Sequence, residues 1–404
     1  MITPYPERIM HELNGNDNLE SLFNSKDNLF FIGKTHIKII LFDTINFKEL
    51  IAYQTKNKIL DITPYPHFDL DFIKSFIVSS IKKISKEFPV DTIFASTHGA
   101  CLALLGKDKL ILPVLDYEHD GPDEIRSEYD KTRLPFHSTG TPAMPAGLNL
   151  AAQIYWQNKR FPDEFAKVDT ILFWPQYWSY WLCGVAASEI SFASSHSDLW
   201  NINESQFIDL KNYGIGTKVK FPKIRSASEI LGPIKKNLAQ EMGLSKEIMI
   251  YCGGHDSSLT LASAYLNYEL PITVISTGTW ITVFSIGKNG VNVNEQKGVM
   301  VSCDCFGNEV PNFRFPGGKI YENHLKRKNE FKKKNLELSL SDIELINFED
   351  TLIPIVHVRD NIEGFFNRST YYNLINFALE NNNIIDDTLY ISSGNKNYPV
   401  GKIA

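Results

Sequence analysis

Cysteine is scarce in this chain, and its arrangement excludes two classes of protein. Of the 404 residues only five are cysteines, namely Cys101, Cys183, Cys252, Cys303 and Cys305. An odd number of scattered cysteines in mostly apolar surroundings does not match the disulfide framework of a small secreted domain. The pair in Cys303-Asp304-Cys305 has no second Cys or His pair at ligand spacing. We therefore expect no zinc site and assign no residue as a metal ligand.

Long apolar runs and an excess of positive charge are also missing. The sequence contains no signal-peptide core and no run of about 20 apolar residues, so we expect a cytoplasmic protein without a membrane partner. The net charge of -6 argues against nucleic acid as a partner. Residues 319–334 are locally basic, and both a solvated helix or loop and an anion-binding patch stay open for them. A homodimer also stays open.

The length of the chain predicts two domains. A chain of 404 residues exceeds one ordinary hydrophobic core. The apolar share of 43% and the charged share of 22% are typical of a globular protein. Residues 1–28 are polar and weakly periodic, and they are interpreted as an extension. A polar stretch between Gly214 and Lys246 predicts the domain change, which gives domains of residues 29–230 and 231–404.

The first domain has a strand-rich start. Residues 29–32, 37–43 and 50–54 predict a three-stranded meander, and the apolar spacing over residues 72–84 predicts a helix. A buried strand over residues 92–95 then runs into His98, and a strand over residues 110–115 runs into Tyr117 and Glu118. Because ligand sites of α/β folds lie at the carboxyl ends of strands, these three residues are candidate binding residues.

The second domain repeats the opening theme. An apolar strand over residues 248–252 precedes a strand, a turn and a second strand within residues 272–284. This order resembles residues 29–43 and indicates an approximate internal duplication. Residues 371–379 predict a helix, and residues 388–391 predict a strand. The whole pattern predicts an α/β fold with two domains.

Two turns near Asp256 carry most of the functional information. Gly253-Gly254-His255-Asp256 follows one apolar strand, and Thr277-Gly278-Thr279 follows another. A third turn, Gly33-Lys34-Thr35, lies near the start. Strands that end in small residues leave backbone N–H groups that can face an anion. One carboxylate among several phosphate-sized turns predicts phosphoryl transfer with Asp256 as the general base. A helix N-cap is the alternative role for Asp256, and the two roles can coexist.

Taken in order, these motifs resemble those of the FGGY carbohydrate kinases, a family of the actin-like ATPase superfamily. The strongest part of the resemblance is GGHDSSLTLASAY followed by ISTGTW. The segments GKTHIK, STHGA, TPAMPAGLNLAAQIYWQ and WPQYWSYWLCGVAASEI, with His196 shortly after, support it. The resemblance covers roughly residues 29–400 and is closest to the rhamnulose- and fuculose-kinase-like branch.

The resemblance implies a fold, a reaction and a set of roles. Two ribonuclease-H-like domains would close a central cleft over a sugar and ATP with Mg²⁺, with sugar binding by residues 29–230 and nucleotide binding by residues 231–404. Asp256 would take the proton from the acceptor hydroxyl. The two nucleotide-phosphate turns and the adenosine element would bind ATP, and their candidate residues are Gly33, Lys34, Thr35, Thr277, Gly278, Thr279, Gly394 and Asn397.

The candidate substrate contacts leave alternatives open. His98 and His255 are each either a sugar contact or a structural hydrogen-bonding group, and Tyr117 and Glu118 favour the substrate. Gln176 completes the predicted sugar pocket. It lies in the aromatic stretch of residues 174–181, which is interpreted either as core packing or as a platform for a sugar.

Three departures from the family pattern leave two functions open. Phe31 stands where the family has an aspartate that helps to hold Mg²⁺, and Ser392-Ser393 stands where it has two glycines. Family members also continue for several dozen residues beyond the point where this sequence ends. We expect a sugar kinase. The alternative is a catalytically weak or inactive relative that binds a sugar or has a regulatory role.

Overall fold

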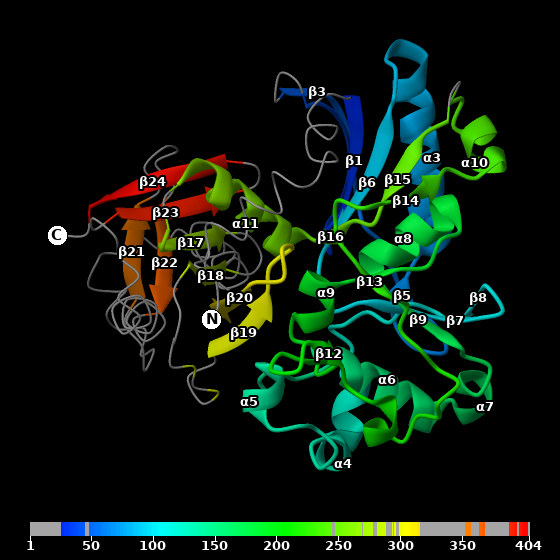
Figure 1. The fold of residues 1–404 in the computed structure, drawn as a ribbon, viewed down its shortest axis with the longest axis vertical. Helices are drawn as coiled ribbons and strands as arrows, with labels where there is room; N and C mark the ends of the chain where they lie inside the picture. The colour runs from blue at the N-terminus through cyan, green and yellow to red at the C-terminus, as the bar shows by residue number, and fades with distance from the viewer. Residues whose placement is uncertain are drawn as a thin grey trace, which may run out of the picture. The chain divides into compact units, whose positions relative to one another are not determined.

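The computed structural model describes residues 26–44, 48–244, 247–268, 270–277, 281–287, 293, 295, 299–315, 352–356, 363–367, 388–393 and 396–402. These residues form two compact units (Figure 1). The first comprises residues up to Ala262 together with Val301–Glu309, and the second comprises Ser263–Met300 and the residues from Val310 on. The predicted helix of residues 371–379, the basic segment of residues 319–334 and residues 1–25 lie outside the described residues.

A seven-stranded sheet forms the centre of the first unit. Its strands are β1 (Lys26–Ile32), β2 (His36–Asp43), β3 (Lys48–Lys56), β6 (Thr92–Thr97), β14 (Ile230–Pro233), β15 (Met249–Tyr251) and β16 (Gly254–His255). The order is β14-β15-β6-β1-β2-β3, and β16 also pairs with β6. The predicted meander is confirmed as the antiparallel strands β1, β2 and β3, although β1 begins at Lys26, within the predicted extension.

Helix α3 (Leu70–Glu87) confirms the predicted amphipathic helix. Its buried residues Ile73, Ile77, Ile81 and Ile84 recur at spacings of four and three, so they form one apolar face that contacts β2. Asp69 begins the helix by accepting a hydrogen bond of 3.0 Å from the Phe72 amide. Helix α8 (Trp174–Cys183) packs against β6, β14 and β15 (Figure 1).

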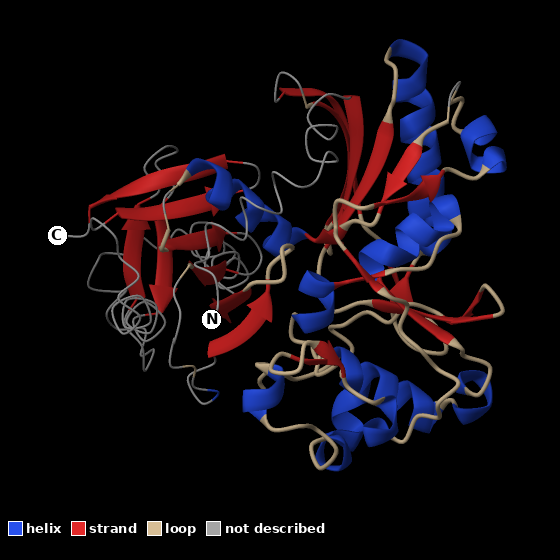
Figure 2. Ribbon diagram, viewed as in Figure 1, coloured by secondary structure: helices blue, strands red, loops and turns tan. Residues whose placement is uncertain are grey.

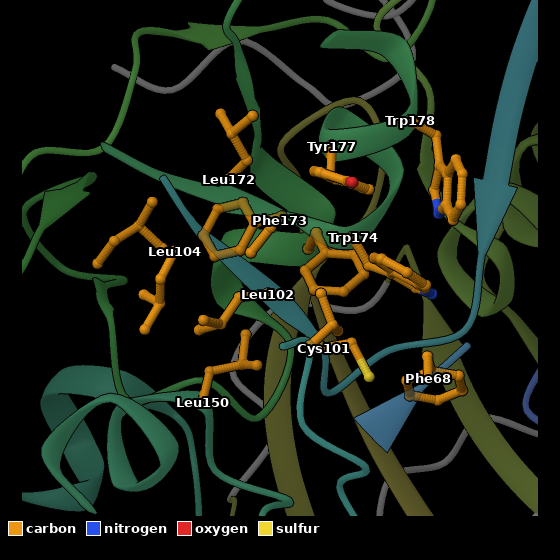
Figure 3. Packing of buried hydrophobic residues seen from close by; sticks show 14 of the residues in the cluster. Phe68, Cys101, Leu102, Leu104, Leu150, Leu172, Phe173, Trp174, Tyr177 and Trp178 are labelled. Carbon is orange, nitrogen blue, oxygen red and sulfur yellow. The ribbon is translucent and has the colours of Figure 1, made fainter. Parts of the chain in front are cut away.

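The aromatic residues of α8 belong mainly to the core. Trp174 and Trp178 are fully buried and pack edge to face at a ring-centroid distance of 5.0 Å. The ring centroids of Phe68 and Trp174 are 5.6 Å apart, and the same hydrophobic cluster includes Cys101, Leu102 and Phe173 (Figure 3). Core packing therefore explains these two tryptophans, and truncating either to alanine would cost about 3–5 kcal/mol of stability.

The remaining elements of the first unit are mostly short (Figure 2). A three-stranded sheet contains β8 (Lys109–Leu112), β7 (Leu102–Gly106) and β9 (Thr170–Phe173), and α6 (Leu150–Arg160) is a longer helix. The other elements are β4 (Ile59–Leu60), β5 (His67–Phe68), η1 (Gly121–Ile125), α4 (Arg126–Tyr129), α5 (Phe136–Thr139), α7 (Pro162–Phe165), β10 (Ser188–Glu189), α9 (Ile190–Ser194), β11 (Trp200–Asn201), β12 (Gln206–Phe207), η2 (Leu210–Tyr213), β13 (Ile224–Arg225) and α10 (Lys236–Glu241).

The described part of the second unit is built on a six-stranded sheet. Its order is β19-β20-β18-β17-β23-β24. The strands are β17 (Ile272–Thr277), β18 (Ile281–Ile286), β19 (Val299–Cys303), β20 (Glu309–Phe315), β23 (Thr388–Ser393) and β24 (Lys396–Lys402). β21 (Leu352–Val356) and β22 (Glu363–Asn367) form a separate antiparallel pair, and α11 (Asp256–Asn267) runs from one unit into the other.

The pairing within the two sheets follows one pattern, which supports the predicted duplication. In the first sheet, β1 pairs antiparallel with β2 and parallel with β6. In the second sheet, β17 pairs antiparallel with β18 and parallel with β23. In the first sheet β2 also pairs antiparallel with β3, and in the second sheet β18 likewise pairs antiparallel with β20.

The boundary between the units differs from the predicted domain change. The sequence placed that change between Gly214 and Lys246, whereas the first unit continues to Ala262. The reason is long-range pairing, because Met249 and Ile250 of β15 pair in parallel with Thr92 and Ile93 of β6. The roles expected for the two domains stay predictions. Among the described residues, no helix is long and apolar enough to cross a membrane.

Candidate functional site

Three predicted site segments leave the same edge of the first sheet. The register aligns Ile32 of β1 with Thr97 of β6, and it aligns Thr97 with His255 of β16. All three strands are parallel, so their carboxyl ends lie side by side. The residues that follow are Gly33, His98 and Asp256, which the sequence separates by long distances but the sheet brings to one edge.

Asp256 is the carboxylate of this edge. It begins α11, is partly buried, and accepts hydrogen bonds from the Ser257 amide at 2.6 Å and the Ser257 hydroxyl at 3.2 Å. The His255 Nε2 atom lies 3.5 Å from Asp256 Oδ1. Burial raises the pKa of Asp256 to about 6, against the opposing effect of the Ser257 hydrogen bonds. A carboxyl group with this pKa is ionised at neutral pH and is a stronger base than an exposed aspartate.

The turn before Asp256 is held by its backbone and by α8. Gly253 has a φ of +75°, and a Cβ atom there would lie 2.3 Å from the Ala95 carbonyl oxygen, so only glycine fits. The buried Gln176 amide donates to the Cys252 and Gly253 carbonyls at 3.2 and 2.9 Å. Ser179 also donates to the Cys252 carbonyl, at 3.0 Å. Gln176 therefore supports the turn from inside the core, and its expected role as a substrate contact stays a prediction.

Gly99 leaves room for two imidazole rings at the same edge. A Cβ atom on Gly99 would lie 2.8 Å from His255 Nε2 and 2.9 Å from His196 Nε2. The His196 Nδ1 atom is 2.8 Å from the Leu148 carbonyl oxygen, and His255 Nδ1 is 3.3 Å from the Ser258 hydroxyl. Each ring is thus tied to its own segment on one side and faces Gly99 on the other.

The turn that carries His196 has a strained backbone conformation, and side-chain contacts stabilise it. His196 and Asp198 have φ values of +42° and +57°, which non-glycine residues rarely adopt. The Asp198 carboxylate is fully buried and is paired with Arg133 at 2.7 Å, and it accepts a hydrogen bond of 2.7 Å from the Tyr129 hydroxyl. Tyr213 donates to the Asp198 carbonyl. This network fixes the turn and, with it, the position of His196.

His98 is buried among aromatic rings. Its ring centroid lies 5.4 Å from that of Phe68 and 5.6 Å from that of Tyr117. The Nδ1 atom is 2.8 Å from the Gly99 carbonyl oxygen, whereas the buried Nε2 atom has no hydrogen-bond partner among the described residues. Burial lowers the pKa of His98 to about 4, with a further contribution from the nearby Lys34 charge, so the ring is neutral at physiological pH.

Lys34 joins the first turn to the predicted substrate residues. Its ammonium group is ion-paired with Asp116 and lies 3.8 Å from Glu118 Oε2. The same group lies 4.8 Å from the centre of the Tyr117 ring and 5.4 Å from that of Phe68. Tyr117 is buried and Glu118 is exposed. The structure thus brings Lys34, His98, Tyr117 and Glu118 together.

The rest of the first turn is a hairpin tip. The Gly33 amide donates to the His36 carbonyl at 2.8 Å, and Thr35 is exposed. The Asn57 side chain donates to the Gly33 carbonyl at 2.9 Å. At Phe31, one residue before the end of β1, the backbone pairs with Lys38 and Ser96. No group of three His, Cys, Asp or Glu side chains in the described ranges is arranged to hold a metal ion.

The predicted nucleotide segments of the second unit belong to neighbouring strands. Thr277, the last residue of β17, pairs with Ser393, the last residue of β23. Because this pairing is parallel, the two strands end at the same edge of the second sheet. Asn397 belongs to β24 and pairs with Ser392 of β23. Gly278, Thr279 and Gly394 lie outside the described residues.

Several residues of the edge were absent from the predicted site. Asp116 and Phe68 both contact Lys34, and Gly99 and His196 lie beside His255. Asp116 had a sequence signal, because it directly precedes Tyr117 and Glu118 at a strand end. Phe68 had none, since one phenylalanine among many carries no information about which charged group it will contact.

The chain matches known families over most of its length. Residues 30–263 match the N-terminal domain of the FGGY family of carbohydrate kinases, and residues 269–368 match a C-terminal domain of FGGY carbohydrate kinases. A crystal structure of a carbohydrate kinase from Novosphingobium aromaticivorans is 28% identical with a TM-score of 0.69, covering 85% of this chain and 75% of that one.

Two curated relatives are more distant. The L-fuculokinase of Escherichia coli K12 is 25% identical over 223 residues, 53% of this chain and 46% of the relative. The xylulose kinase of Haemophilus influenzae is 25% identical over 138 residues, 33% of this chain and 28% of the relative. The chain spans less than half the length of these two proteins. The matched domains, the actin-like ATPase fold of the structural neighbour and the duplicated sheets agree, and the chain belongs to the FGGY family of carbohydrate kinases.

Proposed function

We propose that this chain transfers the terminal phosphoryl group of ATP to a hydroxyl group of a small sugar or sugar derivative, with Asp256 as the general base. The observation that carries the proposal is the Asp256 carboxylate, which is partly buried and has a pKa raised to about 6. It lies at the sheet edge that also holds the His98 and Gly33 turns. Membership of the FGGY family supports phosphorylation of a carbohydrate in general.

The reaction would form one oxygen–phosphorus bond and break another. The substrate hydroxyl oxygen attacks the terminal phosphorus, and the bond from that phosphorus to the oxygen of the departing ADP breaks. Asp256 accepts the proton that the hydroxyl releases. His255, whose Nε2 atom is 3.5 Å from Asp256 Oδ1, and the Ser257 amide orient the carboxylate for this transfer.

The sugar would lie against His98, Tyr117, Glu118 and His255. His98 and Tyr117 supply a ring surface with polar atoms, and Glu118 supplies an exposed carboxylate. Gln176 would complete the sugar pocket, and it also supports the Gly253 turn. The names of the relatives make xylulose and fuculose the first substrates to try.

The candidate residues for ATP remain those that the family resemblance assigns to the nucleotide. The parallel pairing of Thr277 with Ser393 supports a nucleotide segment at one edge of the second sheet. Phe31 supplies no carboxylate at the position where the family has one, so Mg²⁺ would be held mainly by the ATP phosphates and by water. We therefore assign no residue of this chain to the metal.

The alternative function is a catalytically weak sugar-binding or regulatory protein, and Phe31 is the residue that favours it. Calorimetry with ATP and Mg²⁺, followed by sugar-dependent ADP release, separates the two functions. We expect weak but measurable ATP binding and slow transfer that needs a high Mg²⁺ concentration. Sugar binding without any ATP binding at millimolar nucleotide would establish the alternative.

A further inference from the structure

Glu189 is a fully buried carboxyl group that the proposed reaction does not use. It directly precedes helix α9, and its side chain accepts hydrogen bonds from the Ser191 amide at 3.0 Å and from the Phe192 amide at 3.1 Å. The Ser191 hydroxyl donates to it at 2.6 Å. A carboxylate accepts all three bonds, whereas protonation turns one of its acceptor oxygens into a donor. The ionised form therefore fits the start of this helix best.

The same carboxylate lies against the turn that precedes Asp256. A Cβ atom on Gly254 would lie 3.4 Å from Glu189 Oε2, which is van der Waals contact. Helix α9 packs against β16, which consists of Gly254 and His255 (Figure 1). Phe192 of α9 contacts the His255 ring edge to face at a centroid distance of 5.6 Å, and His255 Nε2 is 3.5 Å from Asp256 Oδ1. Contacts thus connect Glu189 through α9 to the proposed base.

The surroundings of Glu189 bring its protonation close to neutral pH. Burial raises the pKa of Glu189 to about 7, and the Asp304 carboxylate raises it further, against the hydrogen bonds from α9. Arg225, on the strand that pairs with β10, forms an ion pair with Glu229. Three thiols that interact with these carboxyl groups are neutral because burial raises their pKa, namely Cys252, Cys303 and Cys305. Glu189 is therefore ionised above about pH 7 and protonated below it.

We propose that Glu189 is a positioning residue for the proposed base: its carboxylate holds α9 in place, and its protonation disturbs the contact of Phe192 with His255 and slows phosphoryl transfer. The proposal rests on the proposed function, because it takes Asp256 as the base. It deepens that function by adding a second carboxylate on which the rate depends. Glu189 acts only through α9 and the turn.

The pH dependence of kcat separates positioning from a merely structural role. Glu189→Gln has nearly the same shape as the protonated side chain and does not titrate, so its kcat should be about tenfold lower than that of the unmodified protein at pH 8, with a smaller change in KM. At pH 5 Glu189 of the unmodified protein is itself protonated, so the ratio of the two kcat values should approach one. The ionisation of Asp256 is common to both proteins and cancels in this ratio. A ratio that is the same at both pH values would overturn the proposal.

Asp69→Asn is the matched control for loss of a carboxylate that begins a helix. Asp69 accepts a hydrogen bond of 3.0 Å from the Phe72 amide. Although burial opposes it, hydrogen bonds from Phe72 and Lys58 lower the pKa of Asp69, so this group is ionised at both pH 5 and pH 8. The ratio of kcat between the unmodified protein and Asp69→Asn should not change with pH. A ratio that falls towards one at pH 5 in this control as well would overturn the assignment to Glu189.

Substitution of Phe192 tests the route to the base. Phe192→Leu keeps the backbone amide that donates to Glu189 but removes the ring that contacts His255. We expect kcat at pH 8 to fall about tenfold, and we expect Glu189→Gln to lower it little further in the double variant, because both changes break one path. Effects that multiply in the double variant would overturn the route through α9.

Amide resonances test the same coupling without any activity measurement. In ¹H–¹⁵N spectra of the unmodified protein, the Phe192 amide, which donates to the carboxylate, should shift with a midpoint near pH 7. The Gly254 amide should follow with the same midpoint if α9 transmits the change to the turn. Both shifts should be absent in Glu189→Gln. No shift of either amide between pH 5 and pH 8 would overturn the proposal, and this measurement decides the question if Glu189→Gln does not fold.

Failure of the inference and failure of the proposed function give different results. If the two amides titrate together near pH 7 but no sugar promotes ADP release, phosphoryl transfer is wrong and the coupling of Glu189 to the turn stands. If ADP release depends on a sugar and on Asp256 but the kcat ratio for Glu189→Gln does not change with pH, phosphoryl transfer stands and the role of Glu189 is wrong.

Discussion

Replacing Asp256 with asparagine should stabilise the protein at neutral and alkaline pH. Burial raises the pKa of Asp256 from 3.8 to about 6, so the folded protein holds this proton more tightly than the unfolded chain does. The stabilisation due to the bound proton is complete below about pH 4 and is lost as the pH rises through about 6. Above that pH the ionised carboxylate lowers the free energy of unfolding by about 3 kcal/mol, since each pKa unit corresponds to about 1.4 kcal/mol.

Asp256→Asn removes this charge and keeps an oxygen that can accept from Ser257. We expect its urea midpoint to exceed that of the unmodified protein at pH 8 and to approach it near pH 4. Asp69→Asn is the control, because the pKa of Asp69 is shifted in the opposite direction. Burial opposes ionisation of Asp69, but hydrogen bonds from Phe72 and Lys58 outweigh it and lower the pKa, so this variant should be less stable at pH 8. An Asp256→Asn protein no more stable than the unmodified one at pH 8 would refute the electrostatic reasoning.

Three further substitutions test other parts of the site. Gln176→Met removes the side-chain amide that donates to the Cys252 and Gly253 carbonyls. We expect kcat to fall about tenfold or more with a smaller change in KM, and an unchanged kcat would show that the turn does not need Gln176. Gly99→Ala forces the His255 and His196 rings apart; we expect about 1–3 kcal/mol less stability and a slower reaction, and equal melting temperatures would contradict the contact. Phe31→Asp should raise the rate or lower the Mg²⁺ requirement in a titration of activity against Mg²⁺, and no change in either would remove Phe31 as the cause of weak catalysis.

Local patterns predicted much of the first sheet and the order of the motifs. The meander of β1, β2 and β3 and helix α3 have periodic apolar residues, and the structure has them where the pattern indicated. The strand before Asp256 was also expected. The strand with which it pairs was not predicted, because an apolar strand has the same sequence pattern in either sheet. Only the parallel pairing with β6 assigns it to the first unit.

The contacts of the candidate site were less predictable than its elements. Lys34 and Asp116 are 82 residues apart in sequence, and nothing local in either segment indicates their ion pair. A buried glutamine near aromatic residues looks the same in sequence whether it faces a sugar or a turn, so the role of Gln176 required its hydrogen bonds. The hydrogen on Nδ1 of His98, and the acceptor it leaves at Nε2, likewise follow only from the backbone carbonyl beside that ring.

The most direct test of the central claim is sugar-dependent ADP release by the unmodified protein and by Asp256→Asn, with sugar affinity measured in parallel. The unmodified protein should release ADP in response to a sugar. Asp256→Asn should lose about 10²–10⁴ of that rate while its sugar affinity stays within a few-fold. An Asp256→Asn protein that turns over as fast as the unmodified one would show that Asp256 is not the base.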